Sequence, residues 1–460
     1  MKITFENLGC IEQGSVELND FTIFCGKNNS GKTYAMYSIY ALFGRRFNTS
    51  FTLDFVKPIV DTLKQTGNYC IDIEEILTKY KAEMLSYIGM DFNNNISTLF
   101  GVPNEHFVNT KIKLQFGVSN DEILAKIKEG DFFGDKMSYS GGLGEWTWIV
   151  NNAEAKIYLE LVNANNIVAG SLQYRISKNL IWTIFSGWFF SYNELNRKSF
   201  LLPAERAGIN LFYKELFSVR NFLLQESQND NVDAMQLLHG VTGARYAEPI
   251  KDYLQFLSNI NMKGFQDITS DYSEYAKALQ NNVVNGSYEI DDFGNISFAP
   301  NSSKIKLPLH FSSSTVKTLF GLVFYLKHSA KKGDYLMIDE PELNLHPENQ
   351  RLVARLLAQL VNAGLKVVVS THSDYFMSEL NNLMMLRKEF SEKASLMKAY
   401  NYKDDELLDV NRVSAYLFKE KTIDVMKKDN VEGIITESFN QVSNALNSAA
   451  NEIYFASQEG

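Results

Sequence analysis

The sequence of 460 residues is poor in cysteine and contains only three, at positions Cys10, Cys25 and Cys70. Their spacing matches no metal-ligand pattern, which excludes a cysteine-based zinc site and a disulfide-rich scaffold. Two of them lie in or near predicted strands. We therefore expect the cysteines to be core thiols of a protein from a reducing compartment.

The sequence also lacks a long apolar run and an excess of basic charge. Its most apolar stretch, residues 180–190, is too short and too interrupted to span a bilayer, and Met1 leads directly into a strand pattern rather than a signal peptide. The formal net charge is −9 and the pI is near 5.4, which argues against a uniformly basic nucleic-acid-binding protein but leaves room for a local basic patch. We expect a soluble, cytoplasmic protein without a membrane partner.

The most informative stretch that is present combines glycines with a Lys-Thr pair. An apolar run at residues 21–25 precedes it, and apolar residues at helical spacing follow at 34–43. In this strand–loop–helix context the pattern G-x-x-x-x-G-K-T predicts a P-loop, whose backbone N–H groups and helix N-terminus face phosphates. Lys32 is predicted to contact the β- and γ-phosphates and Thr33 to ligate Mg²⁺. The predicted nucleotide-binding residues are Gly26, Lys27, Asn28, Asn29, Ser30, Gly31, Lys32 and Thr33.

A second chemical signal follows the apolar residues 335–338, where Asp339 and Glu340 stand side by side. A buried parallel strand would present both acids at its carboxyl end, which is the edge at which α/β sheets bind ligands. The pattern is typical of a Walker B element. Asp339 is predicted to hold Mg²⁺ through water, and Glu340 to orient and deprotonate the attacking water.

The elements around these two signals predict an α/β chain in four segments. Alternating strands and helices near the C-terminal signal indicate a parallel sheet packed with helices. A Gly-rich stretch at 139–144 is followed by no helix pattern, so a turn is favoured there over a second nucleotide site. The segments are 1–203 (a lobe with the P-loop and β-like runs, one of them at 167–175), 204–285 (a mainly helical insertion), 286–400 (the parallel lobe) and 401–460 (a helical cap or interface segment).

The residues at 339–347 (DEPELNLHP) and 367–373 (VVVSTHS) carry a resemblance to a known family. Together with the P-loop they resemble the ABC-type ATPases of the SMC/RecF/OLD group. The resemblance implies an ABC-type ATPase head that binds ATP and Mg²⁺, with a mixed β lobe, a parallel α/β lobe and a large insertion. It also implies that 341–346 form the D-loop and that His372 is a catalytic switch at the γ-phosphate, joining Lys32 and Glu340 in catalysis.

The same resemblance places a signature motif at 310–317 (HFSSSTVK), which lacks the glycines of the usual form. Ser314 is predicted to contact the γ-phosphate held by a second subunit, with Ser312 and Ser313 as alternatives. Another family-like segment, 202–206, ends in Arg206. Two roles stay open for this arginine, namely a contact with phosphate or nucleic acid and a paired structural arginine.

These features predict a slow, Mg²⁺-dependent ATPase that closes head-to-tail as a homodimer or a higher even oligomer. The OLD nucleases continue into a Toprim domain, whereas this sequence has no Asp-x-Asp cluster after a later strand. The resemblance therefore points to the ATPases of the PARIS and Septu anti-phage defence systems, which implies a separate effector, a Toprim or HNH nuclease, and a phage-encoded trigger. The alternatives are an SMC/RecF-like ATPase that acts directly on DNA, and a scaffold that binds ATP tightly and barely hydrolyses it.

Overall fold

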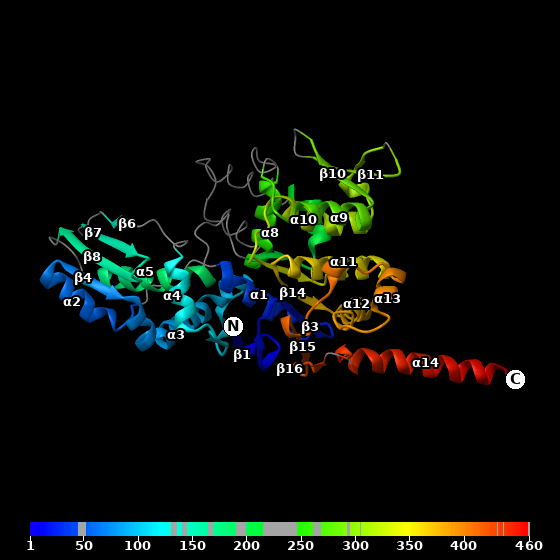
Figure 1. Cartoon of the computed structure of the whole chain (residues 1–460), viewed down its shortest axis with the longest axis horizontal. Coiled ribbons are helices and arrows are strands. Elements are labelled where there is room, and N and C mark those ends of the chain that lie inside the picture. The colour runs from blue at the N-terminus through cyan, green and yellow to red at the C-terminus, as the bar shows by residue number, and fades with distance from the viewer. Residues whose placement is uncertain are drawn as a thin grey trace, which may run out of the picture. The chain divides into compact units, whose positions relative to one another are not determined.

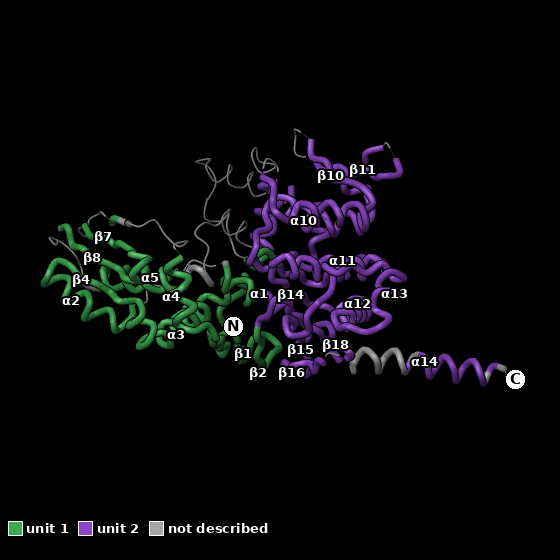
Figure 2. The backbone as a smooth tube through the Cα atoms, in the orientation of Figure 1, with its two compact units in different colours: residues 1–17, 37–200, 247–249 green, residues 18–36, 201–246, 250–460 purple. Residues whose placement is uncertain are grey.

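The computed structural model describes residues 1–44, 52–129, 136–139, 145–163, 169–189, 199–214, 246–260, 268–291, 295–303, 305–429, 431–435 and 437–458. The chain forms two compact units (Figure 2). Unit 1 contains residues 1–17, 37–200 and 247–249, and unit 2 contains residues 18–36, 201–246 and 250–460. These units cut across the four segments expected from the sequence, because the P-loop at 26–33 groups with the C-terminal part of the chain.

Unit 1 contains antiparallel strand pairs and a group of helices. Strand β1 (Lys2–Leu8) pairs with β2 (Ile11–Glu17) and with β5 (Lys111–Gln115). Along β1 the side chains of Ile3 and Phe5 are fully buried, because alternate residues of a strand face the same side. A second sheet has the order β4-β8-β7-β6. Its strands are β4 (Asn68–Asp72), β6 (Lys136–Tyr139), β7 (Glu145–Asn151) and β8 (Lys156–Asn163).

One helix of unit 1 begins where the sequence predicts a strand. Residues 167–175 were expected to be a strand, whereas a helix begins at Ala169. The buried residues Leu172, Ile176, Leu180 and Ile184 recur every four positions, which is the spacing of one helix face, and this packing overrides the β-like composition. The helices are α2 (Val56–Thr66), α3 (Ile73–Phe100), α4 (Asn120–Lys128) and α5 (Ala169–Phe189), with the 3₁₀ turn η1 (Asn104–Phe107).

Unit 2 is built on a predominantly parallel sheet with the strand order β16-β15-β3-β14-β13. Figure 1 shows β14, β3 and β15 side by side. All strands from β15 to β13 run parallel, so their carboxyl ends meet at one edge. Residues 21–25 of β3 are all buried, as expected for a strand covered on both faces. The strands are β3 (Phe21–Gly26), β13 (Tyr335–Asp339), β14 (Lys366–Thr371), β15 (Val413–Lys419) and β16 (Thr422–Val425).

Three helices of unit 2 begin with side-chain caps. Ser313 accepts a hydrogen bond from the Val316 N–H, His346 from the Glu348 N–H, and Ser373 from the Phe376 N–H. Such caps satisfy N–H groups that a helix start otherwise leaves without partners. The described helices of unit 2 are α1 (Lys32–Gly44, continuing into unit 1), α8 (Glu248–Asn259, beginning in unit 1), α9 (Ser273–Leu279), α10 (Ser314–His328), α11 (Pro347–Asn362), α12 (Asp374–Met385), α13 (Lys393–Ala399) and α14 (Glu437–Gln458).

Short elements complete the described chain. A three-stranded sheet has the order β10-β11-β12, and β17 pairs with β18. The remaining elements are β9 (Ser199–Leu202), β10 (Gly286–Ile290), β11 (Ile296–Pro300), β12 (Leu307–Pro308), β17 (Lys428–Asp429), β18 (Gly433–Ile434), the short π-helix η2 (Gln280–Val284) and the 3₁₀ turns η3 (Leu309–Phe311), η4 (Asp404–Glu406) and η5 (Val410–Arg412). In the described part of the chain, no helix is long and apolar enough to cross a membrane.

The C-terminal segment, expected to be helical, requires a correction. Residues 437–458 are helical, but 413–425 form the hairpin of β15 and β16, and β15 pairs with β3 in the central sheet. Val413, Ala415, Tyr416 and Phe418 are buried, on both faces of β15, as expected for a strand in the interior of the sheet next to the P-loop strand. Part of the last segment therefore belongs to the central sheet.

The three cysteines, the Gly-rich stretch at 139–144 and the expected insertion at 204–285 differ in how much of them the structure describes. Cys25 is buried in β3, but Cys10 and Cys70 are exposed, so the expectation of core thiols is wrong for these two. Cys10 lies in the turn between β1 and β2, and Cys70 points outward from β4. β6 and β7 pair antiparallel around the Gly-rich stretch, whose residues 140–144 lie outside the described residues. Within the expected insertion the described residues include α8 and α9, whereas 215–245 and 261–267 lie outside the description.

Candidate functional site

The P-loop connects β3 to α1, as the sequence predicts. Three of its residues have positive φ, namely Gly26 at 145°, Asn29 at 62° and Gly31 at 99°. At Gly26 the requirement for glycine is steric as well, because a Cβ would lie 2.4 Å from the carbonyl oxygen of Phe418 in β15. The loop conformation therefore depends on two glycines and on the strand that the sequence did not reveal.

Lys32 is held inside the loop. Its Nζ donates hydrogen bonds of 2.8 Å to the carbonyl oxygens of both Gly26 and Lys27. Burial lowers the pKa of Lys32, and the nearby carboxylates of Glu340 and Asp339 oppose that shift. The hydroxyl of Ser30 is buried without a hydrogen-bond partner among the described residues. A buried cation and an unsatisfied hydroxyl in a loop of this shape fit the oxygens of a phosphate group.

Thr33 and Asp339 meet although 306 positions separate them in the chain. Thr33 Oγ1 donates a 2.8 Å hydrogen bond to Asp339 Oδ2. Asp339 lies at the end of β13 and is 3% exposed, and its other oxygen, Oδ1, accepts a hydrogen bond from the Ser370 hydroxyl. A hydroxyl and a carboxylate at this spacing fit Mg²⁺, which takes few protein ligands and completes its shell with water and phosphate oxygens. When bound there, Mg²⁺ would neutralise negative charge on the phosphates.

Glu340 has a left-handed backbone with φ of 53°. Its N–H donates to the carbonyl and hydroxyl oxygens of Ser370, each at 3.1 Å, and its own carbonyl accepts a 2.7 Å hydrogen bond from Arg206 Nη2. Its side chain is 20% exposed. The main chain of Glu340 is thus fixed on both sides while its carboxylate stays accessible to solvent.

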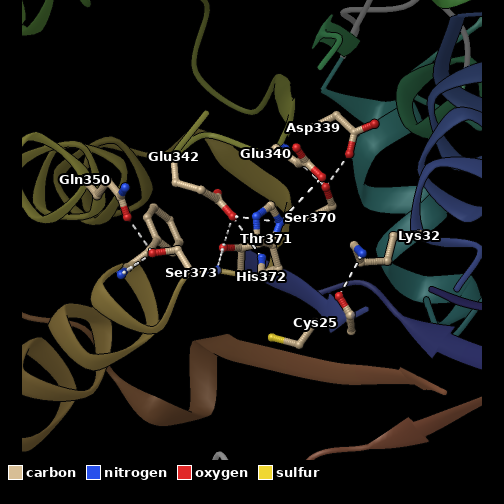
Figure 3. Close-up of polar contacts among 12 residues, drawn as sticks. Cys25, Lys32, Asp339, Glu340, Glu342, Gln350, Ser370, Thr371, His372 and Ser373 are labelled. Atoms are coloured by element: carbon tan, nitrogen blue, oxygen red, sulfur yellow. Dashed lines mark hydrogen bonds and ion pairs between the residues drawn. The ribbon is translucent and has the colours of Figure 1, made fainter. Parts of the chain in front are cut away.

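The side chain of His372 lies next to two carboxylates (Figure 3). Its Nδ1 is 3.5 Å from Glu340 Oε1 and 3.5 Å from Glu342 Oε1. The histidine side chain is 45% exposed, so the imidazole can reach a ligand as well. The structure therefore places the predicted catalytic residues Glu340 and His372 together at the carboxyl edge of the sheet.

Glu342 is a site residue that sequence reasoning missed, since it was assigned only to the expected D-loop. It is 6% exposed, and its Oε1 accepts 2.8 Å hydrogen bonds from the Thr371 hydroxyl and from the His372 N–H. Burial raises the pKa of Glu342, and these hydrogen bonds act in the opposite direction. The signal available in the sequence was an acid two positions after Glu340, in a turn where a solvated surface residue is the usual interpretation.

A further link joins the expected D-loop to the histidine segment. Gln350 on α11 donates from Nε2 to the Leu345 carbonyl at 2.9 Å, and its Oε1 accepts a 2.6 Å hydrogen bond from the Ser373 hydroxyl. Figure 3 shows the dashed contacts that join Gln350 to Ser373 and Glu342 to Thr371 and His372. Two hydrogen-bonded links therefore connect residues 342–345 with residues 371–373.

The three candidate signature serines have different surroundings. Ser312 is buried and donates a 3.1 Å hydrogen bond to the Pro308 carbonyl, and Ser313 caps α10. Ser314 occupies the first position of α10 and is exposed. Its hydroxyl and the helix N-terminus are thus available to a ligand or to another molecule.

Comparison with known proteins decides the family. The family model described as AAA ATPase domain matches residues 1–377. The chain belongs to this ATPase family. No curated protein matches the chain.

Three solved structures are similar to this ATPase chain at low identity. They are an SMC head bound to the C-terminal winged-helix domain of ScpA (10% identity, 92% of this chain and 96% of that chain, TM-score 0.33), the SMC head domain from Thermotoga maritima (10%, 93% and 98%, 0.29) and an SMC head with an extended coiled coil bound to the C-terminal domain of ScpA from Pyrococcus furiosus (14%, 98% and 98%, 0.35). These low TM-scores carry no information about the chemistry of the site.

The family and the observed sheets confirm the predicted α/β class with a P-loop ATPase core. The chain is an ATPase domain, and its candidate site combines the groups that this chemistry requires. A buried lysine and a glycine loop suit the phosphates, a hydroxyl–carboxylate pair suits Mg²⁺, and an accessible carboxylate beside an imidazole suits activation of water.

Proposed function

We propose that the chain is a Mg²⁺-dependent ABC-type ATPase that hydrolyses ATP with Glu340 as the general base. The hydrogen bond between Thr33 and Asp339 carries this proposal, because it joins the P-loop to the Walker B strand across 306 positions. Lys32 would hold the β- and γ-phosphates, with Gly26, Gly31 and the loop residues between them supplying N–H groups.

Within this proposal His372 contacts the γ-phosphate and responds to its loss. Its Nδ1 lies 3.5 Å from Glu340 Oε1, so a change in the position of the imidazole alters the electric field at the base. The carboxylate of Glu340 removes the proton from the attacking water, and the ammonium of Lys32 stabilises charge on the phosphate. Slow turnover is part of the proposal, because the signature at 310–317 has no glycine.

The proposed assembly is a head-to-tail homodimer, or a higher even oligomer, in which Ser314 completes the site of another copy. The exposure of Ser314 at the start of α10 supports this assignment. On the resemblance to anti-phage ATPases, we further propose a separate effector, a Toprim or HNH nuclease, that the nucleotide state controls after a phage-encoded trigger. Purification of the chain with its co-expressed gene neighbours tests the effector part.

The test of the ATPase is to measure hydrolysis against protein concentration for the wild type and for Glu340→Gln. We expect the specific activity of the wild type to rise with concentration, and Glu340→Gln to bind ATP, sediment as a dimer and lose turnover by about 100-fold or more. Glu389→Gln, whose side chain is 87% exposed and pairs with Lys393, serves as the matched control and should retain full activity.

Concentration-independent activity, with no ATP-induced dimer of Glu340→Gln, would count against head-to-tail closure. Binding of DNA that weakens steeply with salt would favour the alternative of an SMC/RecF-like ATPase acting directly on DNA. A single turnover with no further hydrolysis would favour the tight-binding scaffold.

A further inference from the structure

Arg206 is one of the most deeply buried charged residues of unit 2. It is 2% exposed, and within the described chain its guanidinium donates hydrogen bonds to main-chain carbonyl groups. Nη1 donates to the Pro203 carbonyl at 3.1 Å and to the Asp339 carbonyl at 2.7 Å, while Nη2 donates to the Glu340 carbonyl at 2.7 Å. Of the two roles left open by the sequence, these contacts support the structural one, but with the Walker B main chain as partner instead of a carboxylate.

The main chain that Arg206 contacts needs support. Glu340 has φ of 53°, a left-handed backbone conformation that L-residues other than glycine adopt only rarely. Ser370 fixes its N–H, and Arg206 fixes its carbonyl. The planar guanidinium bridges two successive carbonyl groups, those of Asp339 and Glu340, a geometry that the point charge of a lysine cannot reproduce.

The helical residues 206–214, which begin at Arg206, contact a second part of the site. Residues 206–214 are helical, and Asn210 lies one turn after Arg206 on the same face. Asn210 Nδ2 donates a 2.7 Å hydrogen bond to the Lys317 carbonyl of α10, and its Oδ1 accepts one of 2.7 Å from the Tyr253 hydroxyl. Asn210 is 1% exposed, so the link is not open to exchange with water.

The side chain of Tyr253 packs tightly against α10. A Cβ on Gly321 of α10 would lie 2.0 Å from the Tyr253 hydroxyl, so the aromatic side chain packs directly on the helix backbone. The helix at 206–214 therefore touches the end of the Walker B strand at one position and α10, which begins with the candidate signature serine, at the next turn.

We infer that Arg206 is a positioning residue for the base Glu340, and that the helix at 206–214 makes the position of Glu340 depend on that of α10. This inference rests on the proposed ATPase function. A shift of α10 would move Asn210, and through the rigid helix turn it would move the guanidinium that holds the Glu340 carbonyl. Contact of a second copy with the start of α10 would thereby adjust the base in this copy.

A double-mutant cycle between Arg206→Lys and Glu340→Gln tests the inference through hydrolysis of radiolabelled ATP. In the wild-type background, we expect Arg206→Lys to lower kcat by about 10- to 100-fold, because a small displacement of a catalytic group has effects of that size. The Kd of a non-hydrolysable ATP analogue should stay within about threefold of the wild type. In the Glu340→Gln background, Arg206→Lys should change the residual rate by less than about twofold, because its effect passes through the missing base.

Arg355→Lys is the matched control, since Arg355 is also buried but pairs with Glu379, away from the Walker B strand. It should lower stability without lowering the kcat of folded protein. Tyr253→Phe provides a second variant if Arg206→Lys does not fold. It removes only the hydroxyl that holds Asn210, and it should lower kcat by about threefold with the same dependence on Glu340.

Equal losses of kcat in both backgrounds, or an unchanged kcat in Arg206→Lys, would overturn the positioning role while leaving the ATPase in place. A wild type that does not hydrolyse ATP, or a Glu340→Gln variant as fast as the wild type, would instead overturn the proposed function and this inference with it.

Discussion

Replacing Gly26 by alanine tests whether the C-terminal strand β15 supports the P-loop. A Cβ at position 26 would lie 2.4 Å from the Phe418 carbonyl oxygen and 3.0 Å from the Ser30 hydroxyl. Phe418 is paired in register with Gly26, so its carbonyl cannot move without moving the strand. The φ of 145° at this position is also one that side chains rarely adopt.

The size of the effect follows from these two costs. The backbone conformation contributes about 1–3 kcal/mol. Ordinary contacts of a carbon atom lie at about 3.5 Å, so the added Cβ would approach the Phe418 carbonyl oxygen about 1 Å too closely. Overpacking of this kind costs about 1–3 kcal/mol. We therefore expect Gly26→Ala to lower the free energy of unfolding by about 2–6 kcal/mol, a large part of the stability of an ordinary domain. Because Gly26 also accepts a hydrogen bond from Lys32, affinity for ATP should fall as well.

The assay is urea unfolding with two probes. All four tryptophans, at positions 146, 148, 182 and 188, belong to unit 1, so their emission reports that unit, whereas hydrogen exchange of β3 and β15 reports unit 2. The control is Gly333→Ala, where φ is 89° but no atom of the described chain lies within 4 Å of the added Cβ. If Gly26→Ala costs no more than Gly333→Ala, the close approach of β15 to the P-loop is refuted.

Two further predictions concern buried acids of unit 2. Glu379→Ala should lower the free energy of unfolding by about 3–5 kcal/mol, because it removes the hydrogen-bonded carboxylate of the buried Arg355 and leaves only Glu406, 3.9 Å away. A urea midpoint equal to that of Glu389→Ala would contradict this. Burial raises the pKa of Glu342, so the carboxyl group keeps its proton to higher pH in the folded protein than in the unfolded chain. The folded state therefore loses stability as the pH rises above the unfolded pKa of about 4.3 towards the raised pKa of the folded state. Glu342→Gln removes this loss, so the urea midpoint of the variant relative to that of the wild type should rise from about pH 4 to pH 8. A difference in midpoint that does not change with pH would contradict the prediction.

The parts of the site that the sequence predicted share a dense local pattern. The P-loop at 26–33 and the acids Asp339 and Glu340 each combine several chemical requirements in a few adjacent positions, flanked by strands with strong apolar runs. Parallel strands also bring their carboxyl ends to one edge, so the meeting of Thr33 and Asp339 follows once both strands are assigned to one sheet.

The parts that the sequence did not predict depend on contacts between distant positions. The sequence left Arg206 open between a contact with phosphate or nucleic acid and a structural pair, and only the fold shows that its partners are carbonyl groups of residues 133 and 134 positions away. Strand β15 was missed because the surrounding charged residues resemble a solvated helix, whereas pairing with β3 determines its structure. In both cases tertiary packing overrides the local pattern.

The contacts of Glu342 and Gln350 imply that the expected D-loop and His372 move together. Glu342 holds the Thr371 hydroxyl and the His372 N–H, and Gln350 joins the Leu345 carbonyl to Ser373. Because Glu342 is buried, water cannot replace these hydrogen bonds. A movement of residues 342–345 that broke them would leave a buried carboxylate without partners, which is costly. If another subunit presses on the D-loop, as the proposed dimer requires, the displacement would therefore reach the imidazole beside Glu340. The base would then be adjusted from two directions, through the main chain by Arg206 and through the imidazole by Glu342.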